Sequence, residues 1–281
     1  GAGTAKSSGM VTVRSANAMA TGVSGALVFS SGTTKAGASG DISIGTGLAT
    51  GGVAGSVYLT AGRSNQANGA DVVISAGTTS STGGGAVSIT AGQGIGGSGG
   101  SLVFAAGIGT TKTGGFVDIR SGAGTAKSSG MITIRTANAD ATGVSGALVF
   151  SSGEAESGNS GDITIGSGPA TYGNGGFIRL LVGRSDSGSG GIVDIAAGRS
   201  TGGVGGTATL VGGQGSTHGG TVTITAGQGV GGSGGALVMS AGIGTVKDGG
   251  YVDLRSGAGT AKSSGMVTVR SANAMATGVS G

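Results

Sequence analysis

Two glycine-rich patterns in the sequence could do chemistry if the elements around them positioned them correctly. Gly-x-Gly-x-x-Gly occurs at Gly94–Gly99 and at Gly229–Gly234, and in dinucleotide-binding proteins this pattern lets the backbone approach a pyrophosphate. That chemistry needs a strand before the glycines and a helix after them, because the helix N-terminus holds the phosphate. Both patterns here lead into a further apolar alternation. We therefore expect no nucleotide site.

Nucleophilic chemistry is the second possibility. Gly-x-Ser-x-Gly occurs at Gly96–Gly100 and Gly231–Gly235, but a nucleophilic serine in this pattern sits on a turn from a strand to a helix. The single histidine, His218, lies in a predicted turn without an orienting partner for general-base work. The absence of cysteine excludes disulfides and thiolate metal ligands. We predict that the chain is not an enzyme, that it binds no cofactor and that it has no metal site.

Other ligand classes also fit the sequence poorly. A calcium β-roll repeats Asp in its turns, whereas these turns carry Ser, Thr, Gly and Ala. An ice-binding ladder repeats Thr-x-Thr, which occurs only at Thr223 and Thr225. The net charge of +4 is spread thinly and aromatic residues make up 3% of the chain, so we expect no nucleic-acid partner. No apolar run approaches the roughly 18–20 residues of a membrane span.

The elements that would position any site follow from an internal repeat of 15 residues. A typical unit, Gly85–Gly99, reads G-A-V-S-I-T-A-G-Q-G-I-G-G-S-G, and its residues are numbered positions one to fifteen. The steps between units are 15 residues, except for three of 16, counting the last to Gly281, and one of 14. The 18 units begin at Gly9, Gly25, Gly40, Gly55, Ala70, Gly85, Gly100, Gly115, Gly130, Gly146, Gly161, Gly176, Gly191, Gly206, Gly220, Gly235, Gly250 and Gly265.

Each unit predicts one β-strand. Positions three and five are large and aliphatic or aromatic, and position seven is small, so these three share one face of a strand while positions two, four and six share the other. Glycine at position eight ends the strand. The small residues at positions ten and twelve suggest a short return segment whose inward residues are small, so that large residues on one wall of the solenoid face small ones on the other. The predicted fold is all-β: a parallel β-solenoid of about 18 stacked 15-residue units.

The number of units in each turn of the solenoid stays open between one and two. A 25-residue segment recurs after 121 and then after 135 residues, which is eight and then nine units. If each turn held two units, one additional unit would move every later strand to the opposite wall of the solenoid. This spacing therefore favours one unit per turn. Charge argues the other way, because one unit per turn would stack Arg120 near Arg135 and Lys112 near Lys127, and likewise Arg255 near Arg270 and Lys247 near Lys262.

The long-range repeat predicts a single continuous array over residues 1–281. Residues 1–25 and 257–281 are identical, and residues 122–146 differ from them at four positions. Super-repeats thus start near residues 1, 122 and 257, with an extra coil near 191–219. Because neither end shows a polar cap over an open sheet edge, we expect the array to be a segment of a longer repeat protein.

The outward face of the predicted strands is the best candidate for a functional surface. Strands that are apolar on both faces are usually covered on both faces, and a large apolar patch usually binds something. The partner predicted to cover this face is a second copy of the chain. Polysaccharide is a further predicted partner, which the stacked Arg and Lys residues would bind. The outward apolar residues are Met10, Val28, Tyr58, Val73, Val103, Phe116, Met131, Val149, Phe177, Ile192, Val238, Tyr251 and Met266.

The repeated G-x-V-x-I-x-x-G with Ser-, Gly- and Thr-rich turns resembles the low-complexity β-solenoid repeat proteins of microbial and algal cell surfaces, including those of diatoms and related heterokonts. The resemblance implies an extracellular or cell-surface location and an adhesive, wall or filament role. From the residues, we predict a structural protein that forms a fibre, filament or sheath by stacking and lateral association. The alternative is an adhesin-like stalk or a binding surface for polysaccharide or ice.

Overall fold

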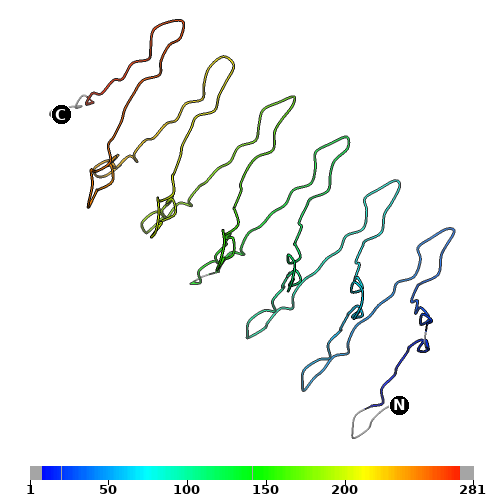
Figure 1. The fold of residues 1–281 in the computed structure, drawn as a ribbon. Helices are drawn as coiled ribbons and strands as arrows, with labels where there is room; N and C mark the ends of the chain where they lie inside the picture. Colours follow the sequence, from blue (N-terminus) through cyan, green and yellow to red (C-terminus); the bar gives the residue numbers. More distant parts are fainter. Residues whose placement is uncertain (1–7, 20, 141, 273–281) are drawn as a thin grey trace. The chain divides into compact units, whose positions relative to one another are not determined.

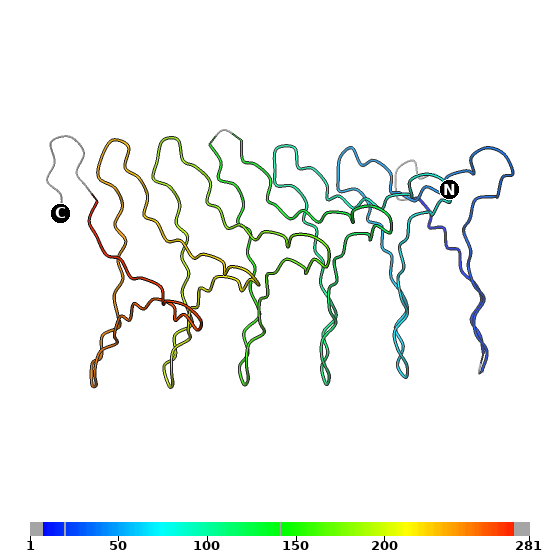
Figure 2. The ribbon, with the colours of Figure 1, turned by 90° about the horizontal axis from the view of Figure 1, so that it is seen from above.

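The structure, a computed structural model, describes residues 8–19, 21–140 and 142–272. Over these residues the backbone contains no helix and no strand. The chain divides into two parts, Gly1–Asn138 and Ala139–Gly281, and each is considered by itself. The first and last copies of the repeated segment, at 1–25 and 257–281, lie partly outside the described residues. Within each part, long extended segments alternate with narrow loops (Figures 1 and 2).

The 15-residue repeat is visible in the backbone as a regular series of bends. In the typical unit that begins at Gly85, the chain bends at residues 95–97, which are positions eleven to thirteen. The same positions bend at 110–112, 125–127 and 245–247. Glycine meets a specific requirement at two of these loops, because Gly37 and Gly96 have φ angles of 110° and 80°, which L-residues with a side chain rarely adopt. Each unit is thus an extended segment followed by a bent loop.

The prediction of an all-β parallel solenoid of stacked units is wrong for the described residues. A parallel sheet requires backbone hydrogen bonds between the extended segments of successive units, and every backbone bond found in the described residues instead closes a loop within a few residues of sequence. No side chain among them is buried, so they form no hydrophobic core. A chain with 71 glycines in 281 residues loses much backbone entropy on ordering, and two large apolar residues per unit compensate little of it.

A backbone hydrogen bond closes many of the loops. The N–H at position one of a unit donates to the C=O at position eight of the preceding unit, as from Gly100 to Gly92 at 2.9 Å. The 14-residue unit closes in the same way, from Gly220 to Gly213 at 2.8 Å, so its missing residue is absorbed by the loop. We call this contact the turn-closing hydrogen bond; it joins the two ends of a loop and does not pair the extended segments of successive units.

The 15-residue units with glycine and those with alanine at position ten differ in this bond. The turn-closing hydrogen bond is found in every such unit with glycine at position ten, as at Gly94 and Gly109, and in the 14-residue unit at Gly215. It is not found among the described residues in the three with alanine there, Ala49, Ala155 and Ala170. A Cβ on Gly94 would collide with the backbone carbonyl of Ser98. In these loops glycine at position ten allows the close backbone approach, whereas the loops with Ser64, Thr79 or Ser200 at this position form the same bond with a side chain there.

A hydroxyl at position ten provides a second way to organise the loop. The Ser200 hydroxyl accepts a hydrogen bond from the N–H of Gly203 at 2.8 Å, and the Ser64 hydroxyl accepts one from the N–H of Ala67 at 2.9 Å. These are the local side-chain-to-backbone bonds typical of Ser and Thr in turns. The small residues at position ten were interpreted from the sequence as an inward wall, whereas in the structure they shape the loop.

Position one meets position seven across the closed loop, which predicts the effect of a methyl group there. Gly85 and Gly115 donate turn-closing bonds of 2.9 Å, but Ala70 donates one of 3.3 Å, and a Cβ on Gly85 would lie 3.3 Å from the Cβ of Ala76.

We expect the substitution Ala70→Gly to shorten the turn-closing bond of residue 70, and Gly85→Ala to lengthen that of residue 85. Amide hydrogen exchange at residues 70 and 85 should slow and accelerate, respectively, by about twofold to fivefold, corresponding to roughly 0.5–1 kcal/mol in loop closure. Unchanged exchange in both variants would contradict this role of position one.

Candidate self-association surface

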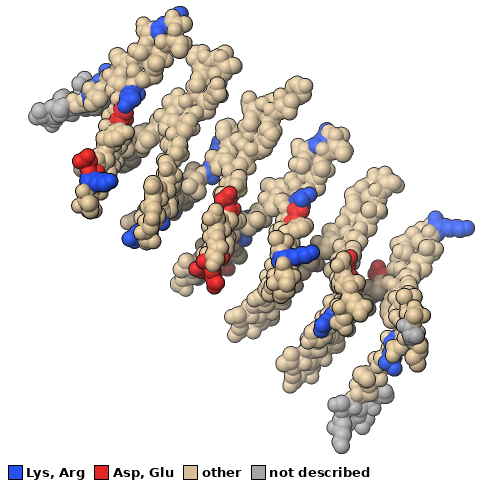
Figure 3. All heavy atoms as spheres, viewed as in Figure 1, with Lys and Arg blue, Asp and Glu red and all other residues tan. Residues whose placement is uncertain are grey.

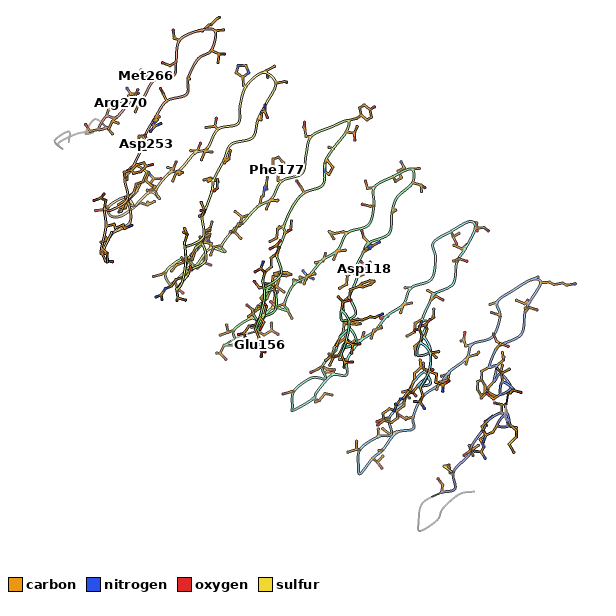
Figure 4. All side chains as sticks on the ribbon, in the orientation of Figure 1. Asp118, Glu156, Phe177, Asp253, Met266 and Arg270 are labelled. Atoms are coloured by element: carbon orange, nitrogen blue, oxygen red, sulfur yellow. The ribbon has the colours of Figure 1, made fainter. Side chains whose placement is uncertain are left out.

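The 13 residues predicted to face outward are among the most exposed large side chains of the extended segments. Their exposed fractions run from 77% at Val28 to 91% at Met10. Phe177 and Met266 extend away from the backbone (Figure 4). Apolar side chains in water at this exposure are unfavourable at roughly 25 cal/mol for each Å² of apolar area. These residues are therefore free to contact another molecule.

The opposite face of each segment is more shielded, although it is not buried. The large residue at position three is mostly about half exposed, from 44% at Val222 to 62% at Ile178, with Val11 an exception at 88%. The few half-buried residues in the described chain all lie at position seven, among them Ala76, Ala91 and Ala226. The two faces predicted from the alternation thus differ in exposure, even though no sheet is present to separate them.

Backbone pairing does not join the outward residues into one continuous face. Met10 to Met131 lie one to a segment in the part Gly1–Asn138, and Val149 to Met266 lie likewise in the part Ala139–Gly281. Among the described residues, no backbone hydrogen bond links one extended segment to the next. Stacking of Arg120 on Arg135, expected from one unit per turn, has no ladder to support it. The surface is a series of separate apolar segments.

Three ion pairs neutralise charges locally in the part of the chain that the structure describes. Arg120 forms an ion pair with Asp118 at 2.6 Å and a hydrogen bond from Nε at 2.9 Å, and the super-repeat places the same pair at Arg255 and Asp253. The Arg179 guanidinium lies 5.3 Å from the centre of the Phe177 ring. Exposed contacts of this kind contribute at most about 1 kcal/mol each. Charged atoms are sparse on the visible surface (Figure 3).

The glycine patterns that could have done chemistry are explained by loop geometry. Gly94 makes the close backbone approach to Ser98, and Gly96 takes a positive φ. Gly229 makes the corresponding approach to Ser233. No helix follows either pattern in the described residues. His218 is exposed in the loop of the 14-residue unit, and the described residues contain no cluster of His, Cys, Asp and Glu that could hold a metal ion.

One hollow lies on the described surface apart from the predicted residues. Arg135, Thr136, Ala137 and Asn138 line an open cavity of about 390 Å³ within the part Gly1–Asn138. This site was not predicted from the sequence. Arg-Ser/Thr-Ala-Asn recurs in all three copies of the 25-residue segment, but so does nearly every other residue of that segment, so the sequence carries no specific signal for the hollow.

Comparison of the chain with protein-family models, with curated proteins and with solved structures finds no match. Among the residues that the structure describes, no helix has the length and apolarity needed to cross a bilayer.

Proposed function

We propose that the chain is a structural repeat protein of an extracellular fibre, filament or sheath, and that it assembles by association of its own exposed apolar segments. The predicted partner is a second copy of the chain. In this proposal the 13 outward residues supply the contact area. The loops between them, which are rich in Gly, Ser and Thr, space the contacting segments and keep the chain soluble.

The observation that supports the proposal is the exposure of every large apolar side chain in the described residues. Monomeric soluble proteins rarely expose large contiguous apolar surfaces, and surfaces of this kind usually mark sites of association. Here the apolar residues recur in each 15-residue unit, and the mean hydropathy of the chain is +0.27. Burial between chains would remove this apolar area from water without requiring a core inside one chain.

Repetition also selects a second copy as the partner. The same apolar alternation recurs 18 times, so one pair of matched segments implies many equivalent pairs along two chains. Linked contacts of this kind strengthen one another, because each later contact forms at a high effective concentration. An array of near-identical segments is therefore suited to polymers in which weak contacts add.

The proposal is tested by assembly of the purified chain at increasing concentration. We expect sedimentation and light scattering to show a cooperative transition to large particles, and electron microscopy to show elongated assemblies. Since apolar burial strengthens with sulfate, ammonium sulfate should lower the threshold concentration. A chain that remains monomeric at high concentration and under these conditions would contradict the proposal, and binding of that monomer to polysaccharide would favour the alternative of a binding surface.

A further inference from the structure

The hollow at Arg135–Asn138 belongs to a segment that the chain repeats three times. Arg-Ser/Thr-Ala-Asn occurs at residues 14–17, 135–138 and 270–273, always after an apolar alternation that begins with methionine. The last residue of the third copy, Asn273, lies outside the described residues. In the copies at 14–17 and 135–138, the hydroxyl residue, Ser15 or Thr136, is half-buried, unlike nearly all of its neighbours.

The polar side chains that line this hollow are suited to an anion. The Arg135 guanidinium can only donate hydrogen bonds, and the Thr136 hydroxyl and Asn138 amide can also donate them. Arg120 and Arg255, at the same position of the preceding units, are ion-paired with an aspartate two residues earlier. The corresponding residue before Arg135 is Thr133, and no ion pair of Arg135 is found among the described residues. A guanidinium in this setting is free to take a planar oxyanion such as a carboxylate.

The chain itself carries a matching acidic loop. Residues 25–32 and 146–153 are identical, yet the loops that follow them differ in charge. Residues 33–39 read TTKAGAS, with one lysine and a net charge of +1, whereas residues 154–160 read EAESGNS, with two glutamates and a net charge of −2. Glu154 and Glu156 are exposed, and no ion pair of either is found among the described residues. The acidic loop therefore offers two free carboxylates beside an otherwise unchanged segment.

We propose that the Arg135–Asn138 hollow, and its copies at the other Arg-Ser/Thr-Ala-Asn segments, bind carboxylates of the acidic loop 154–160 of a second copy of this chain. The inference rests on the proposed function and specifies its contact: apolar segments supply adhesion, and the acidic loop sets which segments meet. Each chain carries one such loop and three Arg-Ser/Thr-Ala-Asn segments, so a chain can accept loops from more than one neighbour and extend an assembly.

The test uses two complementary charge variants of the whole chain. The first carries Arg14→Glu, Arg135→Glu and Arg270→Glu, and the second carries Glu154→Arg and Glu156→Arg. We expect the threshold concentration for assembly to rise at least about fivefold in each variant alone, since an exposed ion pair is worth between about 1.4-fold and fivefold and each variant also introduces repulsion. An equimolar mixture of the two should assemble near the wild-type threshold.

Matched controls separate this contact from a general effect of charge. Arg63→Glu, Lys112→Glu and Arg199→Glu together change the net charge as much as the first variant does but lie outside the Arg-Ser/Thr-Ala-Asn segments, and they should leave the threshold within about twofold of the wild type. Equal effects of the control and the first variant, or a mixture that fails to recover, would overturn the inference. Variants that assemble normally while losing binding to a sulfated polysaccharide would assign the hollow to polysaccharide and also overturn it. A wild-type chain that never assembles would instead contradict the proposed function itself.

Discussion

Replacing Phe116, Phe177 and Tyr251 with lysine is expected to abolish assembly of the chain at any practical concentration. The three aromatic side chains are 84–87% exposed, so lysine can replace them without disturbing a core. Each loses roughly 1.5–3 kcal/mol of apolar burial between chains, and the lysines place like charges at the contact. Three losses together raise the threshold by about a thousandfold or more. Sedimentation velocity over a concentration series measures the change.

The control for this variant adds the same charge in the loops. Ile95, Ile108 and Val230 are 93–95% exposed but lie in the loops rather than on the outward positions of the extended segments. Replacing these three with lysine should raise the threshold by no more than about tenfold. If the loop variant dispersed the assemblies as completely as the aromatic variant, the outward residues would have no special place in the contact.

Glycine at position ten is the second site of large expected effect. Gly109→Ala places a Cβ against the backbone carbonyls of Lys112 and Thr113, which must move apart. Forcing a methyl group into such a space costs about 1–3 kcal/mol, enough to open the turn-closing hydrogen bond from Gly115 to Gly107. Amide exchange at Gly115 should accelerate by about fivefold to a hundredfold.

The reverse change serves as its control, because alanine naturally occupies position ten in three loops. Ala170→Gly removes the methyl group from a loop in which no turn-closing bond to Gly168 is found, and we expect the amide of Gly176 to become protected there. Gly168, at position eight of the same loop, has open space around it, so Gly168→Ala should change little. Faster exchange at Gly176 after Ala170→Gly would contradict the assignment of loop closure to position ten.

The sequence pattern predicts the local features of this chain better than its pairing. The 15-residue spacing and the alternation are local properties, and they reappear as recurring bends and as the difference in exposure between residues such as Phe116 and Val117. The solenoid prediction required a further inference, that segments with this alternation pair with one another. Alternation alone favours a strand only when a neighbouring strand supplies hydrogen bonds and burial, and in the structure Val117 has neither.

The candidate sites divide in the same way. The exposure of the outward residues could be predicted from position alone, because it depends on the face of a single segment, and their role in self-association stays a prediction. The Arg135 hollow could not be predicted from the sequence, because the sequence does not show whether a neighbouring carboxylate pairs with Arg135. Glycine at position ten was assigned to a packed wall, since a requirement for small residues looks the same in sequence whether a side chain or the backbone of the same loop imposes it.

The turn-closing hydrogen bond gives the chain a mechanical property. Each such bond joins residues seven or eight positions apart, a stretch that fully extended would span on the order of 25 Å. Breaking the bond costs only about 0.5–1.5 kcal/mol. A chain under tension is therefore expected to release this stored contour length loop by loop and to recover it when the load is removed. In a fibre, such loops would act as reversible sacrificial bonds that dissipate strain before the contacts between chains fail.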